Sequence, residues 1–367
     1  MLVSEFRFDL SDELIAQEAP PRGTARLLVL DRVTGSRHHD SIGALASFLR
    51  AGDLLVVNNT RVFAARLLGH RYPSGGAVEC LLLGPAQAAT RHPDTEARAH
   101  DGARLYDALM HPGQKLKPGA LVRFEGPAGV LVGEVLERHF HGRRTIRLSS
   151  GSGDGAEALD VDALIDALGH IPLPPYIRRQ DTAADRERYQ TVFARVRGSV
   201  AAPTAGLHFT PELLTSLDER GVERTEITLH VGYGTFKPVR VDRVEDHVVD
   251  PERYEILPAA ANAINRARAE GRRVIAVGTT TTRALEDAAA RGAGLIPSGP
   301  GVASIFIYPG HQFRAIDGLL TNLHLPASSL LMLVAAFGGR DRVLAGYRDA
   351  VSHRYRFYSY GDAMLVI

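Results

Sequence analysis

Between residue 66 and about residue 150 the chain carries short apolar segments that are separated by turn residues and show no helical pattern. The segments cover residues 78–83, 105–109, 121–124, 130–136 and 145–148. The sequence Lys117-Pro118-Gly119 before the third segment is typical of a hairpin turn. Closely spaced strands without a competing helix predict an all-β module, which we expect to close into a small barrel.

The segments on either side of this module have a different character. Apolar stretches with the composition of buried strands occur at residues 26–30, 53–57, 226–231 and 273–277. Because such strands both precede and follow the module, we predict an α/β fold with an inserted barrel. A large mixed α/β domain, residues 1–65 and 151–367, is expected to be interrupted by a β-barrel domain, residues 66–150. A chain of 367 residues is long enough for two domains.

Composition limits the compartment and the partners. The apolar fraction of 45% and the charged fraction of 23% are ordinary for a soluble globular protein. The longest apolar run, residues 330–337, is too short to span a bilayer, and no signal peptide is visible. The single cysteine, Cys80, excludes an internal disulfide and fits a reducing cytoplasm. With a net charge of +1, any nucleic acid must be bound by local basic patches.

Residues 198–210 form a stretch of small residues that includes Ser199, Thr204 and His208. It leads into Thr210, which can cap a helix, followed by Pro211 at the first helical position. A helix N-terminus presents unpaired N–H groups and a partial positive charge, so a ligand site is one interpretation. The other is a tight crossing of backbone inside the core.

Three further polar stretches follow predicted strands. They are Asn58-Asn59-Thr60-Arg61, Gly232-Tyr233-Gly234-Thr235 and the run Gly278-Thr279-Thr280 that leads to Arg283. The last stretch lacks the glycine pattern of a dinucleotide site and the lysine of a P-loop. Since ligands of α/β sheets bind at the carboxyl ends of strands, we expect the second and third of these stretches, together with residues 198–210, to line one cleft. Arg61 and Arg283 are candidates to hold an anion; for Arg283 the alternative is an ion pair with Glu286 or Asp287.

His230 lies at the end of a predicted strand, next to the Gly-x-Gly stretch. It is either a general base or a hydrogen-bonded core histidine, and the sequence leaves both open. His247, Asp250 and Glu252 are close enough in sequence to suggest a metal site. No cysteine or second nearby histidine joins them, so we expect no metal.

Two clusters combine arginine with tyrosine, which suits RNA backbone and bases. One contains Arg178 and Arg179 and continues into a helix predicted over residues 182–195; the other contains Arg354, Arg356 and Tyr358. We predict that these five residues bind RNA. For the first cluster the alternative is a solvated helix face paired to acidic neighbours.

Several of these motifs together resemble one known family. They are residues 198–210, Leu229-His230-Val231-Gly232-Tyr233-Gly234-Thr235-Phe236, Asn58-Asn59-Thr60-Arg61-Val62, residues 321–326 and residues 355–365. The chain resembles the S-adenosylmethionine:tRNA ribosyltransferase-isomerases of queuosine biosynthesis from Phe8 to its C-terminus. The resemblance implies a monomeric cytoplasmic transferase, without membrane association, whose β-barrel is inserted in an α/β domain.

The resemblance also implies the reaction. The ribosyl moiety of S-adenosylmethionine is transferred to 7-aminomethyl-7-deazaguanine at the tRNA wobble position and is isomerised. The product is epoxyqueuosine-tRNA, and adenine and methionine leave. S-adenosylmethionine is then a consumed substrate, and no cofactor is expected. Two other classes stay open from the residues alone: a non-catalytic RNA-binding protein and a sugar-phosphate enzyme.

The chain departs from the family pattern at a few positions. Where the family usually has His-x-Met-His-x-Glu, this chain has His247-Val248-Val249-Asp250-Pro251-Glu252, so that Asp250 replaces the second histidine. Leu323, His311 and His111 also stand where other residues are usual.

The reaction needs a base that removes a proton from the carbon next to the sulfonium, together with groups that hold the substrate. We expect His230 or His208 to be the base and Arg283 to clamp a carboxylate or phosphate. Thr204, Thr235 and Asn322 are expected to position the substrate. The remaining predicted substrate-binding residues are Asn59, Arg61, Ser199, Gly232, Gly234, Thr279, Thr280 and His324.

Overall fold

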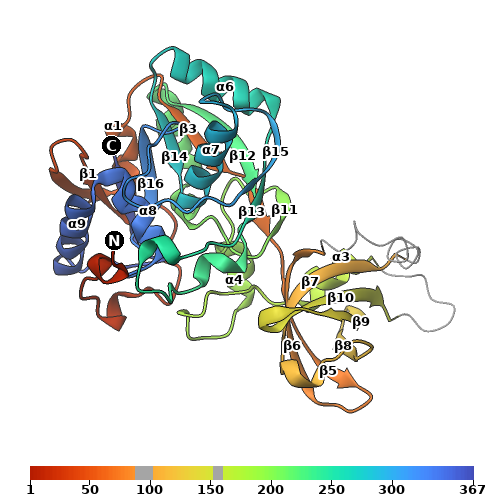
Figure 1. Ribbon diagram of the computed structural model, residues 1–367. Helices are drawn as coiled ribbons and strands as arrows, with labels where there is room; N and C mark the ends of the chain where they lie inside the picture. Colours follow the sequence, from red (N-terminus) through yellow and green to blue (C-terminus); the bar gives the residue numbers. More distant parts are fainter. Residues whose placement is uncertain (87–101, 152–159) are drawn as a thin grey trace.

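The structure, a computed structural model, describes residues 1–86, 102–151 and 160–367. Over these residues the chain forms a nine-stranded sheet covered by helices and, to one side of it, a closed six-stranded barrel (Figure 1). The predicted α/β architecture with a small β-barrel is therefore confirmed. No helix in the described ranges is both long and apolar enough to cross a membrane.

The large sheet is mixed, and its strand directions fix where the loops gather. Its strands in spatial order are β15 (Gly299–Ala303), β13 (Glu252–Ile256), β12 (Glu223–Leu229), β3 (Leu54–Asn58), β14 (Val274–Val277), β16 (Gly318–Asn322), β17 (Ala363–Val366), β1 (Arg26–Leu30) and β2 (Arg37–Ser41). Strands β12, β3, β14 and β16 are parallel, whereas β17 and β1 run the opposite way. The carboxyl ends of the four parallel strands therefore meet the amino ends of β17 and β1 at one edge.

Helices cover both faces of this sheet. On one face lie α6 (Pro258–Ala269), α7 (Thr279–Arg291), α8 (Ser329–Gly338) and α9 (Arg340–Ser352); on the other lie α1 (Leu45–Phe48) and α5 (Pro211–Glu219). Strand β3 is buried along its whole length, and its side chains alternate between the two cores. Leu54 and Val56 join the core under the first group, and Leu55 and Val57 join the core under the second.

The barrel consists of six antiparallel strands. They are β5 (Arg66–Tyr72), β6 (Ala77–Pro85), β7 (Arg104–His111), β8 (Leu121–Gly126), β9 (Gly129–Arg138) and β10 (Arg143–Ser150). Cys80 is buried inside it, as expected of a packed strand residue. The helix α3 (Val161–Leu168) also packs on the barrel, through Leu164 and Ile165, although the boundary predicted at residue 150 assigns it to the large domain.

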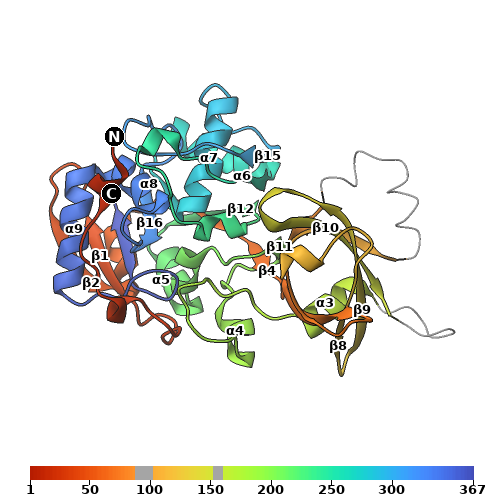
Figure 2. The same ribbon diagram turned by 60° about the horizontal axis from the view of Figure 1, so that its bottom comes forward.

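The chain leaves and rejoins the large sheet at adjacent points. Arg66 and His170 form an antiparallel bridge with two backbone hydrogen bonds of 3.2 and 2.8 Å. Beside this junction β4 (Thr60–Val62) pairs in parallel with β11 (Val196–Ser199), as Figure 2 shows. The helix predicted over 182–195 is shorter: α4 spans Ala183–Arg188, and the residues after it turn into β11.

The remaining described elements are short 3₁₀ turns. They are η1 (Val3–Phe6), η2 (Asp12–Leu14), η3 (Ile42–Ala44), η5 (Gly113–Lys115), η6 (Phe140–Gly142), η7 (Thr204–His208), η8 (Tyr233–Phe236) and η9 (Val244–Asp246). Two of them, η7 and η8, lie in the stretches that the sequence singled out.

Candidate active site

The polar stretches predicted to share a cleft do meet at one edge of the large sheet. Asn58, His230, Gly278 and Asn322 lie at or just after the carboxyl ends of β3, β12, β14 and β16, which are neighbours in the sheet. The small residues of η7 pack into the same edge, where a Cβ atom added to Gly278 would lie 3.7 Å from the Cβ of Ala205. This edge also carries the junction with the barrel.

His230 is half-buried and held by one ring nitrogen. Its Nδ1 lies 2.9 Å from Thr60 Oγ1, and that hydroxyl can donate to the carbonyl oxygen of Val196 at 3.4 Å. With its proton directed there, the Thr60 oxygen accepts from Nδ1–H, which leaves the lone pair on His230 Nε2. Burial and the nearby Arg253 lower the pKa of His230. The neutral, proton-accepting form is therefore favoured at neutral pH.

Gly198 makes room for this imidazole. Its φ is +153°, and a Cβ atom at this position would come within 2.6 Å of His230 Cε1 and 2.7 Å of Nδ1. The glycine is thus required by a close approach of backbone to a candidate catalytic ring. Ser199, the next residue, is buried, and its Oγ accepts from the backbone N–H of Val231 at 2.7 Å.

Asn58 was not among the predicted substrate-binding residues, yet its side chain links the end of β3 to the end of β12. Its Oδ1 accepts from the N–H groups of Thr60 and Leu229, and its Nδ2 donates to the Leu229 carbonyl at 2.9 Å. Asn59, which was selected, turns both ends of its amide toward protein groups, Thr228 Oγ1 at 2.7 Å and Glu226 at 3.3 Å. Arg61 is exposed at the junction. The available signal for Asn58 was its position as the last residue of an apolar strand.

Glu252 organises the Gly-x-Gly stretch. Its carboxylate is 3% exposed and accepts from the Gly232 N–H at 3.0 Å, from Thr235 Oγ1 at 3.1 Å and from Arg283 Nη1 at 2.9 Å. Burial raises the pKa of Glu252 against the opposing effect of Arg283. Thr235 and Gly232 are therefore bound to a structural carboxylate.

Arg283 does not have the free guanidinium that the predicted anion clamp requires. Besides Glu252, it donates to the carbonyl oxygens of Ile305, Asp250 and Ala303 at 3.2, 3.2 and 3.0 Å. Its partner is also neither Glu286 nor Asp287, the alternative considered from the sequence. The reason is that α7 already begins at Thr279, which places Arg283 in the second turn, facing β13 and β15 instead of the strand ends.

The acidic residues near His247 do not gather into a metal site. Across the described ranges, His247, Asp250 and Glu252 form no group of metal-ligand atoms. Asp250 pairs with Lys237 Nζ at 2.6 Å, and a Cβ atom on Gly234 would lie 2.5 Å from its Oδ2. His247 packs edge-on against Phe306. Gly234 is therefore required for the approach of Asp250.

His208 lines a pocket at the amino ends of β1 and β17. The pocket is a small hollow with a cavity volume of about 20 Å³, room for about one water molecule, and its walls include Pro20, Pro21, Leu207 and Tyr360. His208 is 6% exposed, and burial, against the opposing effect of Asp362, lowers its pKa to about 4. Its polar side-chain neighbour is Asn322, and the interaction between the two favours the protonated ring. The imidazole and this amide therefore face each other beside the pocket.

Asn322 lies beside His208 and interacts with its ring. Its Nδ2 donates to the carbonyl oxygen of Tyr358 at 2.8 Å, and its Oδ1 is buried. His324, two residues on, is instead a core residue: its Nε2 contacts Thr321 Oγ1 at 3.0 Å, and burial lowers its pKa to about 3. Its predicted contact with substrate stays a prediction.

The threonines of the third stretch lie at the start of α7. Thr279 and Thr280 are each 6% exposed and form its first turn, after Gly278 with φ +95°. Thr204 is partly buried at the start of η7. These three residues border the sheet edge without a side-chain hydrogen bond that would commit them elsewhere in the structure described.

Tyr358 is not the exposed stacking platform that the sequence suggested. It is 7% exposed, its φ is +75°, and its ring packs edge-on against Tyr176 with the centroids 3.9 Å apart. Its carbonyl oxygen is the one that holds Asn322. Tyr358 is therefore a packed residue, and the prediction that its ring stacks on tRNA from an exposed position is wrong.

The predicted tRNA-binding arginines divide into two kinds. Arg179 forms a bidentate pair with buried Asp185, at 2.7 and 2.9 Å, and Arg356 pairs with buried Asp362 at 2.6 Å. Both serve the fold, as the acidic-neighbour alternative for the first cluster supposed. Arg178 and Arg354 are exposed, with 73% and 69% of their side chains accessible, and pair only with exposed acids. They alone of the four remain accessible for a phosphate.

The fold and this edge define an α/β enzyme with a strand-end active site next to an attached barrel. Comparison with known proteins places it more closely: residues 3–366 match the family described as "Queuosine biosynthesis protein". The chain belongs to this family.

Individual relatives match over their full length. The chain is 48% identical to the S-adenosylmethionine:tRNA ribosyltransferase-isomerase of Heliobacterium modesticaldum, covering 100% of both chains. It is also 48% identical to that of an Anaeromyxobacter species, covering 100% of this chain and 99% of the relative. The crystal structure of S-adenosylmethionine tRNA ribosyltransferase from Thermotoga maritima matches with a TM-score of 0.52 and 33% identity, covering 99% of this chain and 100% of the other.

Proposed function

We propose that the protein is an S-adenosylmethionine:tRNA ribosyltransferase-isomerase. It transfers the ribosyl moiety of S-adenosylmethionine to 7-aminomethyl-7-deazaguanine in tRNA, isomerises it and gives epoxyqueuosine-tRNA with release of adenine and methionine. The observation that carries the proposal is the match, end to end, to relatives of that name at 44–48% identity. Asp250, which stands where the family usually has a histidine, pairs with Lys237 at 2.6 Å.

Within this function His230 is proposed as the base. Its Nδ1 is occupied by Thr60, so Nε2 is the nitrogen available to take the proton from the carbon next to the sulfonium. Its pKa is lowered, which keeps the base form populated. His208 is assigned a different role, because its pKa of about 4 makes it a weak base.

His208 and Asn322 are proposed to bind the adenine of S-adenosylmethionine. The two side chains lie together at the strand-end edge, and an imidazole and an amide can each donate to and accept from the edge of a heterocycle once their mutual contact opens. Three strand intervals separate the end of β12 from the end of β16, about 14 Å at the usual spacing, so His230 and Asn322 can contact different parts of one substrate.

The tRNA is expected to enter beside the barrel junction, where Arg61 is exposed, with Arg178 and Arg354 as accessible phosphate contacts. We further expect a cytoplasmic monomer that needs neither metal nor cofactor for turnover.

The test is an assay with S-adenosylmethionine and tRNA carrying 7-aminomethyl-7-deazaguanine. Adenine and methionine should appear in equal amounts, and digestion of the tRNA should yield epoxyqueuosine by mass spectrometry. His230→Gln should abolish turnover while keeping S-adenosylmethionine affinity, whereas His208→Gln should weaken that affinity. His70→Gln, on the barrel strand β5, is the matched control.

The two alternatives give different results in the same assay. A non-catalytic RNA-binding protein would bind the tRNA and release no adenine. A sugar-phosphate enzyme would show no dependence on tRNA. Either result would overturn the proposal.

A further inference from the structure

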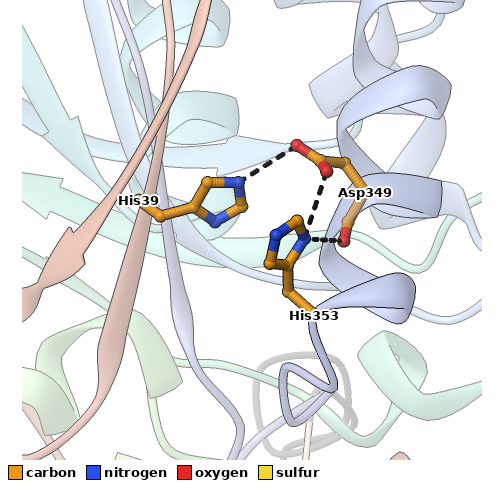
Figure 3. A group of neighbouring side chains, drawn as sticks. All are labelled: His39, Asp349 and His353. Carbon is orange, nitrogen blue, oxygen red and sulfur yellow. Dashed lines mark hydrogen bonds and ion pairs between the residues drawn. The ribbon is translucent and has the colours of Figure 1, made fainter.

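A second cluster, of side chains that can act as metal ligands, lies away from the strand-end site, where β2 meets the C-terminal end of α9 (Figure 3). His39 comes from β2, Asp349 from the last turn of α9 and His353 from the residue that caps this helix. One nitrogen or oxygen atom from each residue lies within 4.8 Å of the others. His39 Nε2 is 3.1 Å from Asp349 Oδ2, and His353 Nδ1 is 3.2 Å from Asp349 Oδ1.

Both ring nitrogens of His39 have an oxygen neighbour. Nδ1 lies 2.9 Å from the hydroxyl of Tyr355, which can also donate to the carbonyl oxygen of Leu27 at 3.4 Å, and Nε2 lies 3.1 Å from Asp349 Oδ2. In the tautomer that donates Nδ1–H to Tyr355, Nε2 turns a lone pair toward the carboxylate, and a cation between the two binds both. His353 Nδ1 also lies 3.0 Å from the backbone carbonyl oxygen of Asp349, a contact that a metal replaces. A metal-binding histidine usually donates the N–H of its other ring nitrogen to an oxygen atom, and the Tyr355 hydroxyl can be that acceptor for His39 Nδ1.

We propose that His39, Asp349 and His353 bind a divalent zinc ion, with water completing the coordination. Two imidazoles and one carboxylate form a donor set that zinc accepts, and such borderline ligands exclude magnesium and calcium. Asp349 and His353 are four residues apart on a helix, so they project on the same side and need little rearrangement. The side chains are 32%, 22% and 56% exposed for His39, Asp349 and His353, which leaves the ion a path from solvent.

Two arginines oppose the ion and set the expected strength. Arg37 Nε lies 3.0 Å from Asp349 Oδ2 and competes for the oxygen that faces His39. Arg26 donates to the His353 carbonyl oxygen at 2.8 Å. The affinity is therefore moderate, and removal of the Arg37 charge increases it. Tighter zinc binding after the loss of Arg37 distinguishes a cation site from a structural ion-pair cluster, because a structural cluster would be weakened by the same change.

The zinc joins an edge strand to a helix and leaves the proposed reaction untouched. Within residues 1–86, 102–151 and 160–367, β2 pairs only with β1, so a bond to α9 would hold this edge strand from a second side. A ligand that binds the folded state alone raises the unfolding temperature with its concentration. Zinc is thus expected to stabilise the protein without being required for turnover.

The experiment uses the full-length, untagged protein after treatment with a chelator. Zinc binding is measured by titration calorimetry and by the unfolding temperature, and cobalt serves as a spectroscopic probe of nitrogen and oxygen ligands. We expect one zinc per chain. His39→Gln and His353→Gln should each raise the Kd at least about tenfold. Arg37→Gln should lower the Kd several-fold.

His38→Gln is the matched control, because His38 lies on the same strand, is 62% exposed and pairs with Asp40 instead. It should leave the Kd unchanged. Each variant's unfolding temperature without metal shows whether it folds, and only folded variants are compared. Three results would each overturn the proposal: no saturable zinc binding, the same loss of zinc affinity in His38→Gln as in His39→Gln, or weaker zinc binding in Arg37→Gln. Absence of saturable binding would mean that the cluster holds a proton instead of a metal.

Discussion

The close approach of Gly198 to His230 provides the sharpest test of the catalytic assignment. In Gly198→Ala the new methyl carbon would lie 2.6 Å from His230 Cε1, about 0.8 Å inside the shortest ordinary contact of 3.4 Å. The imidazole must therefore move by about that distance. Since its Nδ1 bond to Thr60 is 2.9 Å long, such a movement along the bond direction stretches it beyond hydrogen-bonding range.

A misplacement of about 1 Å in a catalytic group can lower turnover by about 100-fold, or ~2.7 kcal/mol of transition-state stabilisation. We therefore expect kcat of Gly198→Ala to fall by about two orders of magnitude, with S-adenosylmethionine affinity unchanged. The measurement is adenine release under saturating tRNA and S-adenosylmethionine.

Gly310→Ala is the control, because Gly310 also has a positive φ, +110°, but no atom within 4 Å of the added Cβ. It imposes backbone strain without touching a ring. If Gly198→Ala folds and turns over at the rate of Gly310→Ala, the position of His230 does not govern the reaction and the assignment of the base is wrong.

Three further predictions rest on the same structure. Because burial lowers the pKa of His230, the acid limb of kcat/KM should lie below the ordinary histidine value of about 6.5, and a limb at or above that value would contradict its role as base. Arg283→Ala leaves buried Glu252 unpaired and should destabilise the protein by about 3 kcal/mol in denaturant unfolding; a stable but inactive variant would revive the anion clamp. Arg178→Ala should reduce the log–log salt slope of tRNA binding by about 0.7 to 0.9, whereas Arg179→Ala should chiefly lower the unfolding temperature; equal slopes for Arg178→Ala and wild type would exclude that contact.

The architecture was predictable because it depends on patterns that are local in sequence. Short strands separated by turns identify the barrel, and apolar strands on both sides identify the interrupted sheet. The strand-end position of the polar stretches follows from the parallel order of β12, β3, β14 and β16. These features need no knowledge of individual side-chain partners.

The errors concern residues whose role depends on such partners. Arg283 resembles an anion clamp until Glu252, 31 positions away, is brought against it. Tyr358 looks like a surface aromatic, but Tyr176 covers it from a distant segment. Arg179 and Arg356 look basic in sequence, and each is neutralised by a buried aspartate. Long-range pairing of charges and rings leaves no periodic trace, so sequence alone could not separate structural arginines from accessible ones.

The bridge between Arg66 and His170 has a consequence for how the molecule can be taken apart. A doubly hydrogen-bonded antiparallel pair holds its two Cα atoms about 5.5 Å apart, so a two-glycine joint could replace everything between them. The barrel and α3 therefore form a unit that could be excised or exchanged between relatives without changing the strand order of the large sheet. Asp162 and Asp166 of α3 pair with Arg197 of β11, so an exchanged unit would have to keep these two carboxylates.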